Sequence, residues 1–334
     1  MIILGIETSC DETAAAVLRN GKLLSNIIYS QLNTHKIYGG VVPEIAAREH
    51  LVKLPYVINE AINNAKVNYN DIDVIAVTYG PGLVGSLIVG ICYAKGISFG
   101  LKKKIIGINH LEAHLLSPFL EYDDFDFPFL GIVVSGGHTN VYFADKFGEY
   151  RLLGETRDDA AGEAFDKVAK LLNLEYPGGP AISRAAQKGD AQKIIFPQSQ
   201  MKDKSYDFSF SGLKTSVLYY LKDHSEDIKN GKITINDIAA GFQKTVSRTI
   251  MNKIKRIYRE YKVKRIALTG GVAANSYLRQ ELQRFGDEKG IKIYIPSMVL
   301  CTDNAAMVAY VGWLKASKRI YSDFTLEAEP GLKL

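Results

Sequence analysis

Three apolar segments of the sequence end in the same way, and this repetition constrains the fold more than any other feature. Residues 2–6 run into Glu7-Thr8-Ser9, residues 130–134 into Ser135-Gly136-Gly137, and residues 266–269 into Gly270-Gly271. A short apolar run that ends in small or hydroxylated residues is typical of a buried β-strand followed by a tight turn. Glycine in such a turn lets backbone N–H groups approach an anion. The pattern predicts strands whose turns face phosphate, with plain tight turns as the alternative.

The region after the first turn indicates a meander of hairpins. Two further apolar runs, residues 13–18 and 23–29, flank the turn sequence Arg19-Asn20-Gly21. A similar strand, turn and strand begin at residue 130, so the sequence predicts two halves of like design. The pattern breaks at residues 122–126. We therefore expect two domains, residues 1–125 and 126–334.

Helical periodicity fills the stretches between the strands, and the expected fold class is α/β. The expected helices cover residues 42–65, 83–101, 159–172, 237–261, 275–285 and 304–316. Residues 194–216 lack a clear period and are expected to form an irregular loop region.

The composition, 47% hydrophobic and 23% charged among 334 residues, is that of a globular protein with room for two domains. The N-terminal residues form only a short apolar run without a basic leader, so we expect no signal peptide there. The longest apolar stretch, residues 83–100, contains Lys95 and several glycines, which favours a core helix over a membrane span. Cys10, Cys92 and Cys301 form no C-x-x-C pair, which argues against a disulfide framework. We expect a cytoplasmic protein with no membrane partner.

Two histidines, His110 and His114, stand four residues apart. On a helix this spacing places both imidazoles on one face, where they can bind one metal ion. The order H-x-E-x-H places Glu112 about 200° around the helix from His110. That position is wrong for the general base of a zinc protease, which follows H-E-x-x-H. A pair of histidines on a helix surface is the alternative interpretation.

Asp303 is the candidate for a third ligand. Two imidazoles and one carboxylate form a facial ligand set for Fe(II) or Zn(II) that leaves positions open. Asp303 also stands just before the helix expected from residue 304, where capping that helix is its alternative role. The spacing along the sequence does not bring Asp303 to the histidines.

The net charge of +5, from 41 basic and 36 acidic residues, is a mild bias toward polyanions. The densest basic groups lie at residues 102–104, 253–259 and 262–265. They are candidates for phosphate contacts, and solvated helix faces are the alternative.

Nine short motifs resemble, in order, the signatures of the universal tRNA N6-adenosine threonylcarbamoyltransferase family. Six look like signatures of the family as a whole: GIETSCDET (5–13), PEIAAREH (43–50), GPGL (80–83), NHLEAH (109–114), VSGGHT (134–139) and DNAA (303–306). Three resemble the bacterial branch: DDAAGEAFDK (158–167), YPGG (176–179) and FSFSGLK (208–214). The resemblance covers essentially the whole chain. Thr269 stands where many relatives have serine, a small departure beside the glycine pair.

The resemblance implies a fold like that of actin, sugar kinases and chaperone ATPases, with two related domains around a nucleotide cleft. It also implies the reaction: a threonylcarbamoyl group moves from threonylcarbamoyl-AMP to N6 of the adenosine next to the anticodon, at position 37, in tRNAs that read codons beginning with A. By the same resemblance His110, His114 and Asp303 hold one divalent metal ion, Fe(2+) or alternatively Zn(2+). The residues implied to contact the adenylate and its acyl group are Val134, Ser135, Gly136, Gly137, His138, Asp166, Gly179 and Asn275.

Asp11, with Glu12 as the second choice, is implied to accept the proton from N6; fixing the turn between two strands is the alternative role. The bacterial resemblance further implies three macromolecular partners: tRNA, an inactive paralogue of the same fold that forms a heterodimer with this chain, and a small P-loop ATPase.

Two other function classes stay open, an ATP-dependent small-molecule kinase of the same fold and a nucleotide-gated, non-enzymatic scaffold. The metal triad discriminates among them, because a kinase uses phosphate-bound Mg²⁺ and a scaffold requires no triad.

Overall fold

The computed structural model describes residues 1–198 and 205–334, which form two compact units. The first unit contains Met1–Phe125 and Pro296–Leu334, and the second contains Asp126–Ile295. The expected second domain, residues 126–334, is thus too long at its C-terminal end. The reason is that α12 (Ala305–Ser317) packs against the strands β1, β2 and β4 of the first unit.

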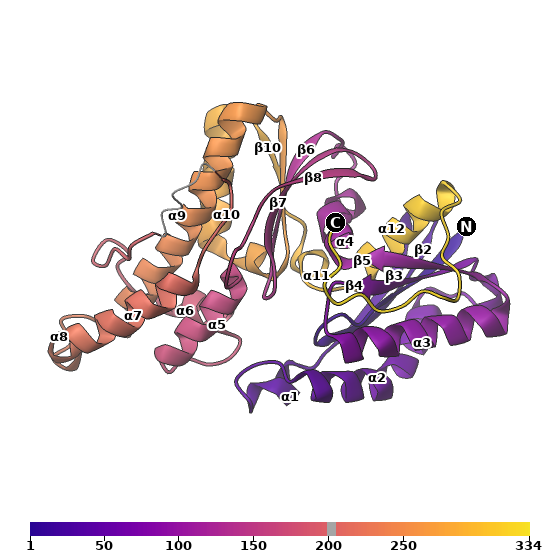
Figure 1. Cartoon of the computed structure of the whole chain (residues 1–334), viewed down its shortest axis with the longest axis horizontal. Helices are drawn as coiled ribbons and strands as arrows, with labels where there is room; N and C mark the ends of the chain where they lie inside the picture. Colours follow the sequence, from indigo (N-terminus) through magenta and orange to yellow (C-terminus); the bar gives the residue numbers. More distant parts are fainter. Residues whose placement is uncertain (199–204) are drawn as a thin grey trace. The chain divides into compact units, whose positions relative to one another are not determined.

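The first unit is built on a five-stranded sheet in the order β3-β2-β1-β4-β5 (Figure 1). Its strands are β1 (Ile2–Glu7), β2 (Glu12–Arg19), β3 (Lys22–Ser30), β4 (Val74–Gly80) and β5 (Lys104–Asn109). The first three form an antiparallel meander, as the turn sequences predicted, while β4 runs parallel to β1 and β5 parallel to β4.

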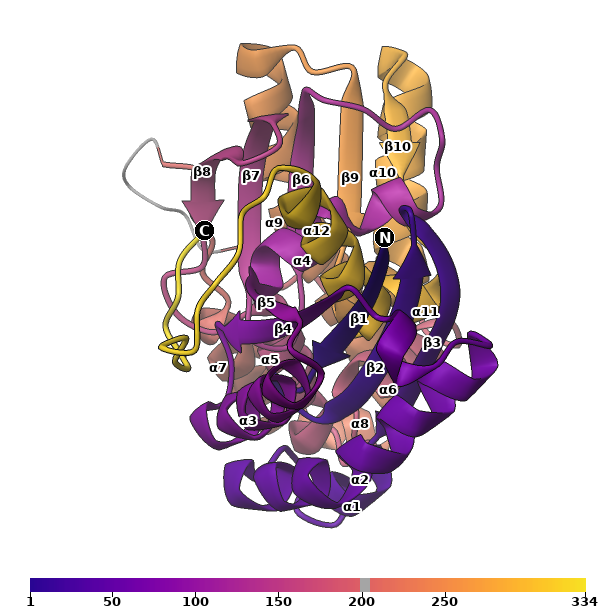
Figure 2. The ribbon, with the colours of Figure 1, turned by 90° about the vertical axis from the view of Figure 1, so that its right-hand side faces the viewer.

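Helices cover both faces of this sheet, because successive side chains of a strand point to opposite faces. On β2, Ala15 and Val17 join the core formed with α2 (Pro43–Asn64) and α3 (Val84–Leu101), whereas Ala14 and Ala16 pack with residues of α12. Figure 2 shows α12 on one side of the strands and α2 and α3 on the other. The shorter helices of this unit are α1 (Leu32–Lys36), η1 (Tyr69–Asp71), α4 (His110–Leu116), η2 (Ser117–Leu120) and α11 (Met298–Cys301).

Small residues allow α12 to approach the central strand closely. A Cβ atom at Gly5 of β1 would lie 2.5 Å from the carbonyl oxygen of Ala305, so only glycine fits there. After α12 the chain returns along the ends of β5 and β4. The backbone N–H of Ser322 donates to Ile105 O, and that of Glu329 donates to Tyr79 O.

The second unit has a five-stranded sheet in the order β10-β9-β6-β7-β8. Its strands are β6 (Phe129–Val134), β7 (Thr139–Lys146), β8 (Glu149–Glu155), β9 (Arg265–Thr269) and β10 (Lys292–Tyr294). β6, β7 and β8 form an antiparallel meander, and β9 and β10 continue the sheet in parallel from β6. Counted within each unit, the strands follow the same order and directions as in the first unit. The prediction of two halves of like design, and of an α/β fold, is confirmed.

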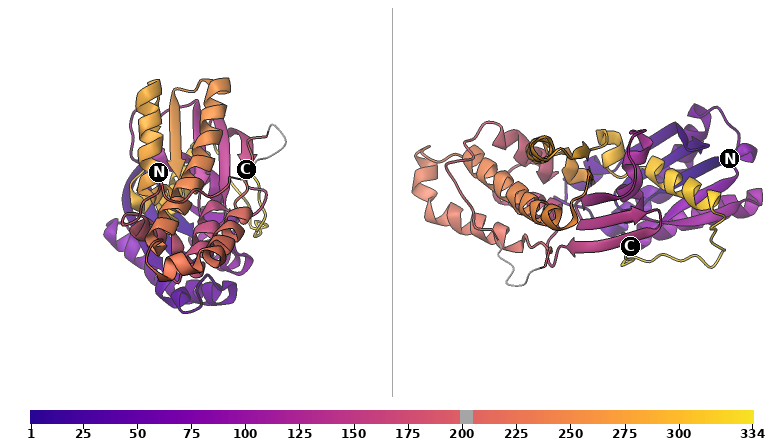
Figure 3. Two further views of the ribbon diagram at one scale, coloured as in Figure 1. Left: turned by 90° about the vertical axis from the view of Figure 1, so that its left-hand side faces the viewer. Right: turned by 90° about the horizontal axis from the view of Figure 1, so that it is seen from above.

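The helices of the second unit are α5 (Ala161–Leu171), α6 (Gly178–Ala186), α7 (Ser211–Asp223), α8 (Ser225–Lys229), α9 (Ile235–Tyr261), η3 (Gly271–Ala274) and α10 (Ser276–Lys289). The long helix α9, orange in Figure 3, packs against α6 and α10. The irregular region expected at residues 194–216 is too long, since α7 begins at Ser211. The carboxylate of Asp158 accepts hydrogen bonds from the N–H groups of Phe210 and Ser211 there. Residues 199–204 of that region lie outside the described part of the chain.

Among the helices of the described residues, α3 alone is long and apolar enough to cross a membrane by length and composition. It packs against β4 and α2, and about a third of it is buried. The expected core helix thus buries one face only.

Candidate metal centre and adenylate turn

The two histidines lie on one short helix directly after β5. Asn109 caps this helix, α4: its side-chain oxygen accepts hydrogen bonds from the N–H groups of Leu111 (2.8 Å) and Glu112 (3.2 Å). The imidazole rings of His110 and His114 are buried, with centroids 4.6 Å apart. The prediction that one helix presents both imidazoles on one face is confirmed, and the alternative of two surface histidines is wrong.

Asp303 faces both histidines. Its Oδ1 lies 2.9 Å from His114 Nε2 and 3.6 Å from His110 Nε2. Asn304, not Asp303, caps α12, because its side-chain oxygen accepts the N–H of Met307 at 3.0 Å. The alternative role of Asp303 as a helix cap is therefore wrong. The neighbouring asparagine, itself a strong capping residue, was the signal in the sequence that separates the two roles.

These three side chains suit a divalent transition metal. One ligand atom from each lies within 4.8 Å of the others. Ligand atoms about 2.1 Å from one ion are separated by roughly 3 to 3.5 Å, which is close to the distances from Asp303. Two imidazoles and a carboxylate are the donor set typical of Fe(II) or Zn(II). The residues present can thus hold such an ion.

The electrostatics of the cluster follow from burial and from two carboxylates. Burial alone would lower the pKa of His110, but the carboxylates of Asp303 and Glu7 outweigh it and raise the pKa to about 9. Burial lowers the pKa of His114. The cluster is therefore a strongly anionic environment for one of its two imidazoles.

Glu112 points away from the metal ligands, as the helical geometry predicted. Its Oε2 forms an ion pair with Lys315 Nζ of α12 at 2.9 Å. This pairing leaves Glu112 in a structural position, which argues against a protease.

The acidic loop between β1 and β2 is held by a histidine that the sequence analysis assigned no role. His50 of α2 is fully buried; its Nε2 donates to the carbonyl of Cys10 at 2.9 Å, and Thr13 Oγ1 lies 2.8 Å from its Nδ1. Asp11 and Glu12 follow Cys10 directly. The place of His50 in the motif PEIAAREH was the available signal in the sequence. It did not reveal the role of His50, because Cys10, its partner, lies 40 residues away.

Glu12 differs from Asp11 in its surroundings. Burial, together with the carboxylates of Asp11 and Asp303, raises the pKa of Glu12 well above its ordinary value. The hydroxyl of Ser30 also donates to Glu12 Oε1 at 3.3 Å. The carboxyl group of Glu12 is therefore harder to ionise than an exposed one.

Most of the residues that the resemblance implies to contact the adenylate lie in the second unit, at the end of β6 and in the turn that follows it. The N–H of Ser135 donates to the carbonyl of His138 (2.8 Å), and the N–H of His138 donates to Ser135 Oγ (3.1 Å). Apart from the chain neighbours of each glycine, no atom of the described residues lies within 4 Å of a Cβ built on Gly136 or Gly137. The turn after Val134 is thus closed by two hydrogen bonds, and the space beside its two glycines is free of other side chains.

The helix α5 begins beside this turn, and α6 begins beside α5. The N–H of Gly162 in α5 donates to the carbonyl of Ser135, which attaches α5 to the turn. Further along α5, Asp166 Oδ1 accepts the N–H of Gly178 at the start of α6 (2.7 Å), and the next residue, Gly179, also has open space around its Cβ position. The turn, α5 and the start of α6 are therefore connected by hydrogen bonds.

Asn275 has a structural role in this unit. Its side-chain oxygen caps α10 by accepting the N–H of Leu278, and its amide group donates to Gln243 at 2.8 Å. The preceding turn contains Gly270, which has a φ of +88° and whose Cβ would collide with Val134 O. The glycine therefore lets the turn after β9 lie against the end of β6.

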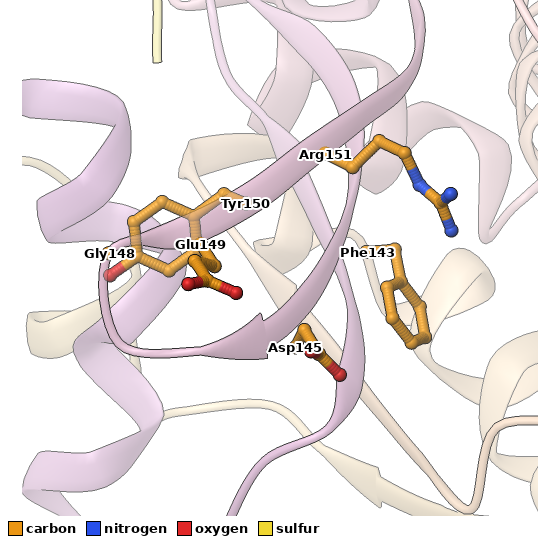
Figure 4. A pocket seen from close by; sticks show the side chains of 6 residues that line it. All are labelled: Phe143, Asp145, Gly148, Glu149, Tyr150 and Arg151. Atoms are coloured by element: carbon orange, nitrogen blue, oxygen red, sulfur yellow. The ribbon is translucent and has the colours of Figure 1, made fainter.

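One hollow of the second unit contains none of the expected site residues. It has a volume of about 520 Å³ and lies at the β7–β8 hairpin (Figure 4), lined by Phe143, Asp145, Gly148, Glu149, Tyr150 and Arg151. Arg151 stacks over the rings of Phe143 and Tyr261, at 5.4 and 5.1 Å. Its guanidinium group thus holds the hairpin against α9.

Basic residues of α9 already contact other parts of the second unit. Lys253 Nζ and Arg256 Nη1 both donate to the carbonyl of Ser205, and Arg256 stacks on Tyr206. Lys255 lies over the ring of Phe285 on another side of the helix. These three residues therefore do not form one free cationic face, and tRNA binding by them stays a prediction.

Comparisons with known proteins agree with the resemblance. The family model for tRNA N6-adenosine threonylcarbamoyltransferase matches residues 22–310. The enzyme of that name from Thermosipho africanus is 50% identical over 334 residues, with all of both chains covered. The one from Clostridium perfringens is 49% identical over 334 residues, covering 100% of this chain and 98% of its own.

A likeness to solved structures agrees with the fold. Full-length HypF in its phosphate- and nucleotide-bound form superposes with a TM-score of 0.64 at 17% identity, over 96% of this chain and 56% of that chain. At this identity the likeness shows the fold alone, which is that of the actin-like ATPases, with two α/β domains. The match over most of the sequence and the near-complete coverage of relatives half identical to it show that this chain belongs to the tRNA N6-adenosine threonylcarbamoyltransferase family, a family of transferases.

Proposed function

We propose that this chain transfers the threonylcarbamoyl group of threonylcarbamoyl-AMP to N6 of the adenosine at position 37 in tRNAs that read codons beginning with A. The observation that carries the proposal is the cluster of His110, His114 and Asp303 in a member of this family. A bond forms between N6 and the carbamoyl carbon. The bond from that carbon to the phosphate oxygen breaks, AMP leaves, and N6 loses a proton.

The cluster is proposed to hold one divalent ion, Fe(2+) or Zn(2+). When bound, such an ion supplies a Lewis acid for the carbonyl oxygen of the transferred group. The two imidazoles and Asp303 provide three ligands and leave further positions open. The kinase and scaffold alternatives give this buried cluster no role.

The turn at the end of β6 is proposed to bind the adenylate. Gly136 and Gly137 have no side chain on the open side of the turn, so their backbone can approach a phosphate closely. The start of α6, with Gly179 open and Asp166 accepting the N–H of Gly178, is proposed to face the adenosine end. Nucleotide binding by HypF, which shares the fold, is consistent with this assignment.

Asp11 is proposed to accept the N6 proton. Glu12 is the second choice for this role, because burial and the neighbouring carboxylates raise its pKa and so make its carboxyl group harder to ionise. His50 supports this role by fixing the backbone of Cys10, one residue before Asp11. A base must lie within hydrogen-bond reach of its proton, so the position of this loop matters.

Partner proteins are proposed to cover an apolar surface of the first unit. Large apolar side chains on α2, α3 and the segment after α1 are more than 45% exposed: Ile37, Tyr38, Leu51, Val52, Tyr56, Val84 and Ile88. α2 and α3 pack against each other, and exposed apolar groups of this kind mark protein interfaces. An inactive paralogue of the same fold is the proposed occupant, with a small P-loop ATPase as a second partner. Since its substrate is tRNA, the chain is proposed to act in the cytoplasm.

The test is transfer of labelled threonylcarbamoyl from the adenylate to tRNA by the purified protein, with and without the two partner proteins. The matched control is the same tRNA with guanosine at position 37. Label on the adenosine-containing tRNA alone supports the proposal. Absence of transfer with metal and both partners present, or phosphorylation of a small molecule instead, contradicts it.

A further inference from the structure

We propose that Glu7 is a positioning residue of the metal site, whose carboxylate fixes the tautomer and the ring orientation of His110. The inference rests on the proposed metal site and adds a residue to it. Glu7 is the last residue of β1 and is completely buried. Nothing in the motif GIETSCDET itself assigns a role to this carboxylate, because Thr78 and His110, its side-chain partners, lie far away in the sequence.

Both oxygens of Glu7 are engaged by hydrogen-bond donors. Oε1 accepts the backbone N–H of Ser9 at 2.6 Å, and Oε2 accepts the hydroxyl of Thr78 at 2.6 Å. The same Oε2 lies 3.1 Å from His110 Nδ1. Both oxygens thus accept from other donors, which is the pattern of an ionised carboxylate, a group that can only accept.

An ionised carboxylate at this distance requires a proton on Nδ1 of His110. Ser9 Oγ also lies 3.1 Å from Nδ1. A hydroxyl could donate to a bare Nδ1, but the lone pair of that nitrogen would then face the carboxylate. Once Nε2 has given up its own proton to make way for a metal ion, a ring with its remaining proton on Nδ1 has its lone pair on Nε2, which is the atom that faces Asp303. This is the tautomer that binds a metal through Nε2.

The second histidine has no such support. Nδ1 of His114 is buried and has no hydrogen-bond partner among the residues that the structure describes. Its Nε2 is oriented by the ligand Asp303 itself. The His110 ring is thus contacted by a carboxylate at each of its two nitrogens, Glu7 at Nδ1 and Asp303 at Nε2. The His114 ring is contacted by a carboxylate only at Nε2. We therefore expect loss of Glu7 to act on metal binding through His110.

Glutamine cannot replace Glu7 without a conflict. The carboxylate accepts from three donors, at both of its oxygens, whereas glutamine offers one oxygen and one NH₂ group. If the NH₂ group faces Ser9, two N–H groups oppose each other. If it faces His110, it donates to Nδ1 and moves the ring proton to Nε2, where it blocks the metal. The glutamine side chain of E7Q is therefore nearly the same size as that of glutamate, but it places a hydrogen-bond donor where an acceptor is needed.

The test measures Zn²⁺ affinity of the full-length protein by competition with a chromophoric chelator. We expect E7Q to bind Zn²⁺ ten- to a hundredfold more weakly than the parent, the usual effect of losing such a partner of a ligand. T78V is the matched control, since it removes one donor to Glu7 and leaves the contact with His110; it should stay within about threefold of the parent.

A double-substitution cycle separates positioning from a general structural role. In the H110A background, E7Q should change Zn²⁺ affinity by less than twofold, because the ring that Glu7 orients is absent. An equal loss in both backgrounds would overturn the proposal, as would an E7Q protein with parental affinity. If E7Q does not fold, E7D replaces it, whose carboxylate is one methylene shorter and should give the same pattern at reduced size.

The cycle also distinguishes this inference from the metal site on which it rests. If H110A and D303N bind Zn²⁺ like the parent, the metal site itself is wrong. If both lose Zn²⁺ while E7Q keeps it, only the role of Glu7 is overturned.

Discussion

Glu112 and Lys315 form an ion pair, Oε2 to Nζ at 2.9 Å, that joins the helix of the two histidines to the helix that follows Asp303. Both side chains are largely buried, at 6% and 19% exposed. The pair therefore connects the two segments that provide the proposed metal ligands.

The first prediction concerns this pair. Glu112→Leu leaves Lys315 without its carboxylate in a mostly buried position, so we expect a loss of about 2 to 3 kcal/mol in the free energy of unfolding. The double variant E112L/K315M removes both charges and should recover most of that loss. Urea unfolding of the three proteins tests this, and a double variant no more stable than E112L would contradict it.

The second prediction separates metal binding from helix capping. Asp303→Asn removes the anionic ligand while Asn304 still caps α12, so Zn²⁺ affinity should fall at least tenfold with the melting temperature of the metal-free protein unchanged. Asn304→Ala is the control, for which we expect lower stability and unchanged Zn²⁺ affinity. It should cost about 1 kcal/mol of stability and retain the three ligands. Equal metal content in D303N and the parent would remove Asp303 from the site.

The third prediction concerns the loop that contains Asp11. His50→Phe keeps the shape of the ring but loses the hydrogen bond to Cys10 O. Displacement of a catalytic group by about 1 Å costs up to a hundredfold in rate, so we expect transfer to slow at least tenfold, with Zn²⁺ affinity unchanged. Thr13→Val removes a contact at Nδ1 of the imidazole and leaves the one from Nε2 to Cys10 O, so it should have a smaller effect. A parental transfer rate in H50F would show that the imidazole does not position the loop.

The fourth prediction concerns the pH dependence of stability in the second unit. Burial would raise the pKa of Asp237, but hydrogen bonds from the Asp190 N–H, Lys193 Nζ and the Thr234 N–H lower it well below its ordinary value of 3.8. A lowered pKa contributes stability above pH 3.8, and this stability is lost as the pH falls toward the lower, folded-state pKa. Asp237→Asn should therefore be less stable than the parent at pH 7, and the difference should shrink below pH 3.8. Calorimetry at pH 7, 4 and 3 measures it; a difference that stays constant over this range would contradict the role of the charge.

The fifth prediction concerns tRNA. Arg259 and Lys264 are exposed and lie within the basic groups, whereas Lys253 and Arg256 are engaged with Ser205. If the exposed residues contact phosphates, changing both to alanine should reduce the slope of log K against log salt by about 0.7 to 0.9 for each. Zn²⁺ affinity should not change. A salt slope equal to that of the parent would place the RNA surface elsewhere.

The first strands of each unit and the long helices were predictable from the sequence because their signals are local. The hairpin at residues 19–21 and the long periodic helix α9 each depend on neighbours within a few turns of the chain. The capped start of α7 was not predictable in this way, since the carboxylate that caps it, Asp158, lies 52 residues before Phe210.

In the candidate site, too, contacts between residues far apart in the sequence could not be predicted. The spacing of His110 and His114 is a local signal, and the resemblance supplied Asp303. The contacts of Glu7 with Thr78 and His110 span 71 and 103 residues, and they depend on the order of β1, β4 and β5 in the sheet. No local pattern in the sequence indicates that β4 pairs with β1, or β5 with β4.

The division of the first unit into two separate stretches of chain has a consequence for synthesis. Asp303 is added 189 residues after His114, and the whole second unit is translated between them. At about 5 to 20 residues per second, the nascent chain displays two histidines for on the order of ten to forty seconds before their carboxylate exists. The proposed metal site is therefore incomplete until Asp303 has been translated, although both of its histidines are made early.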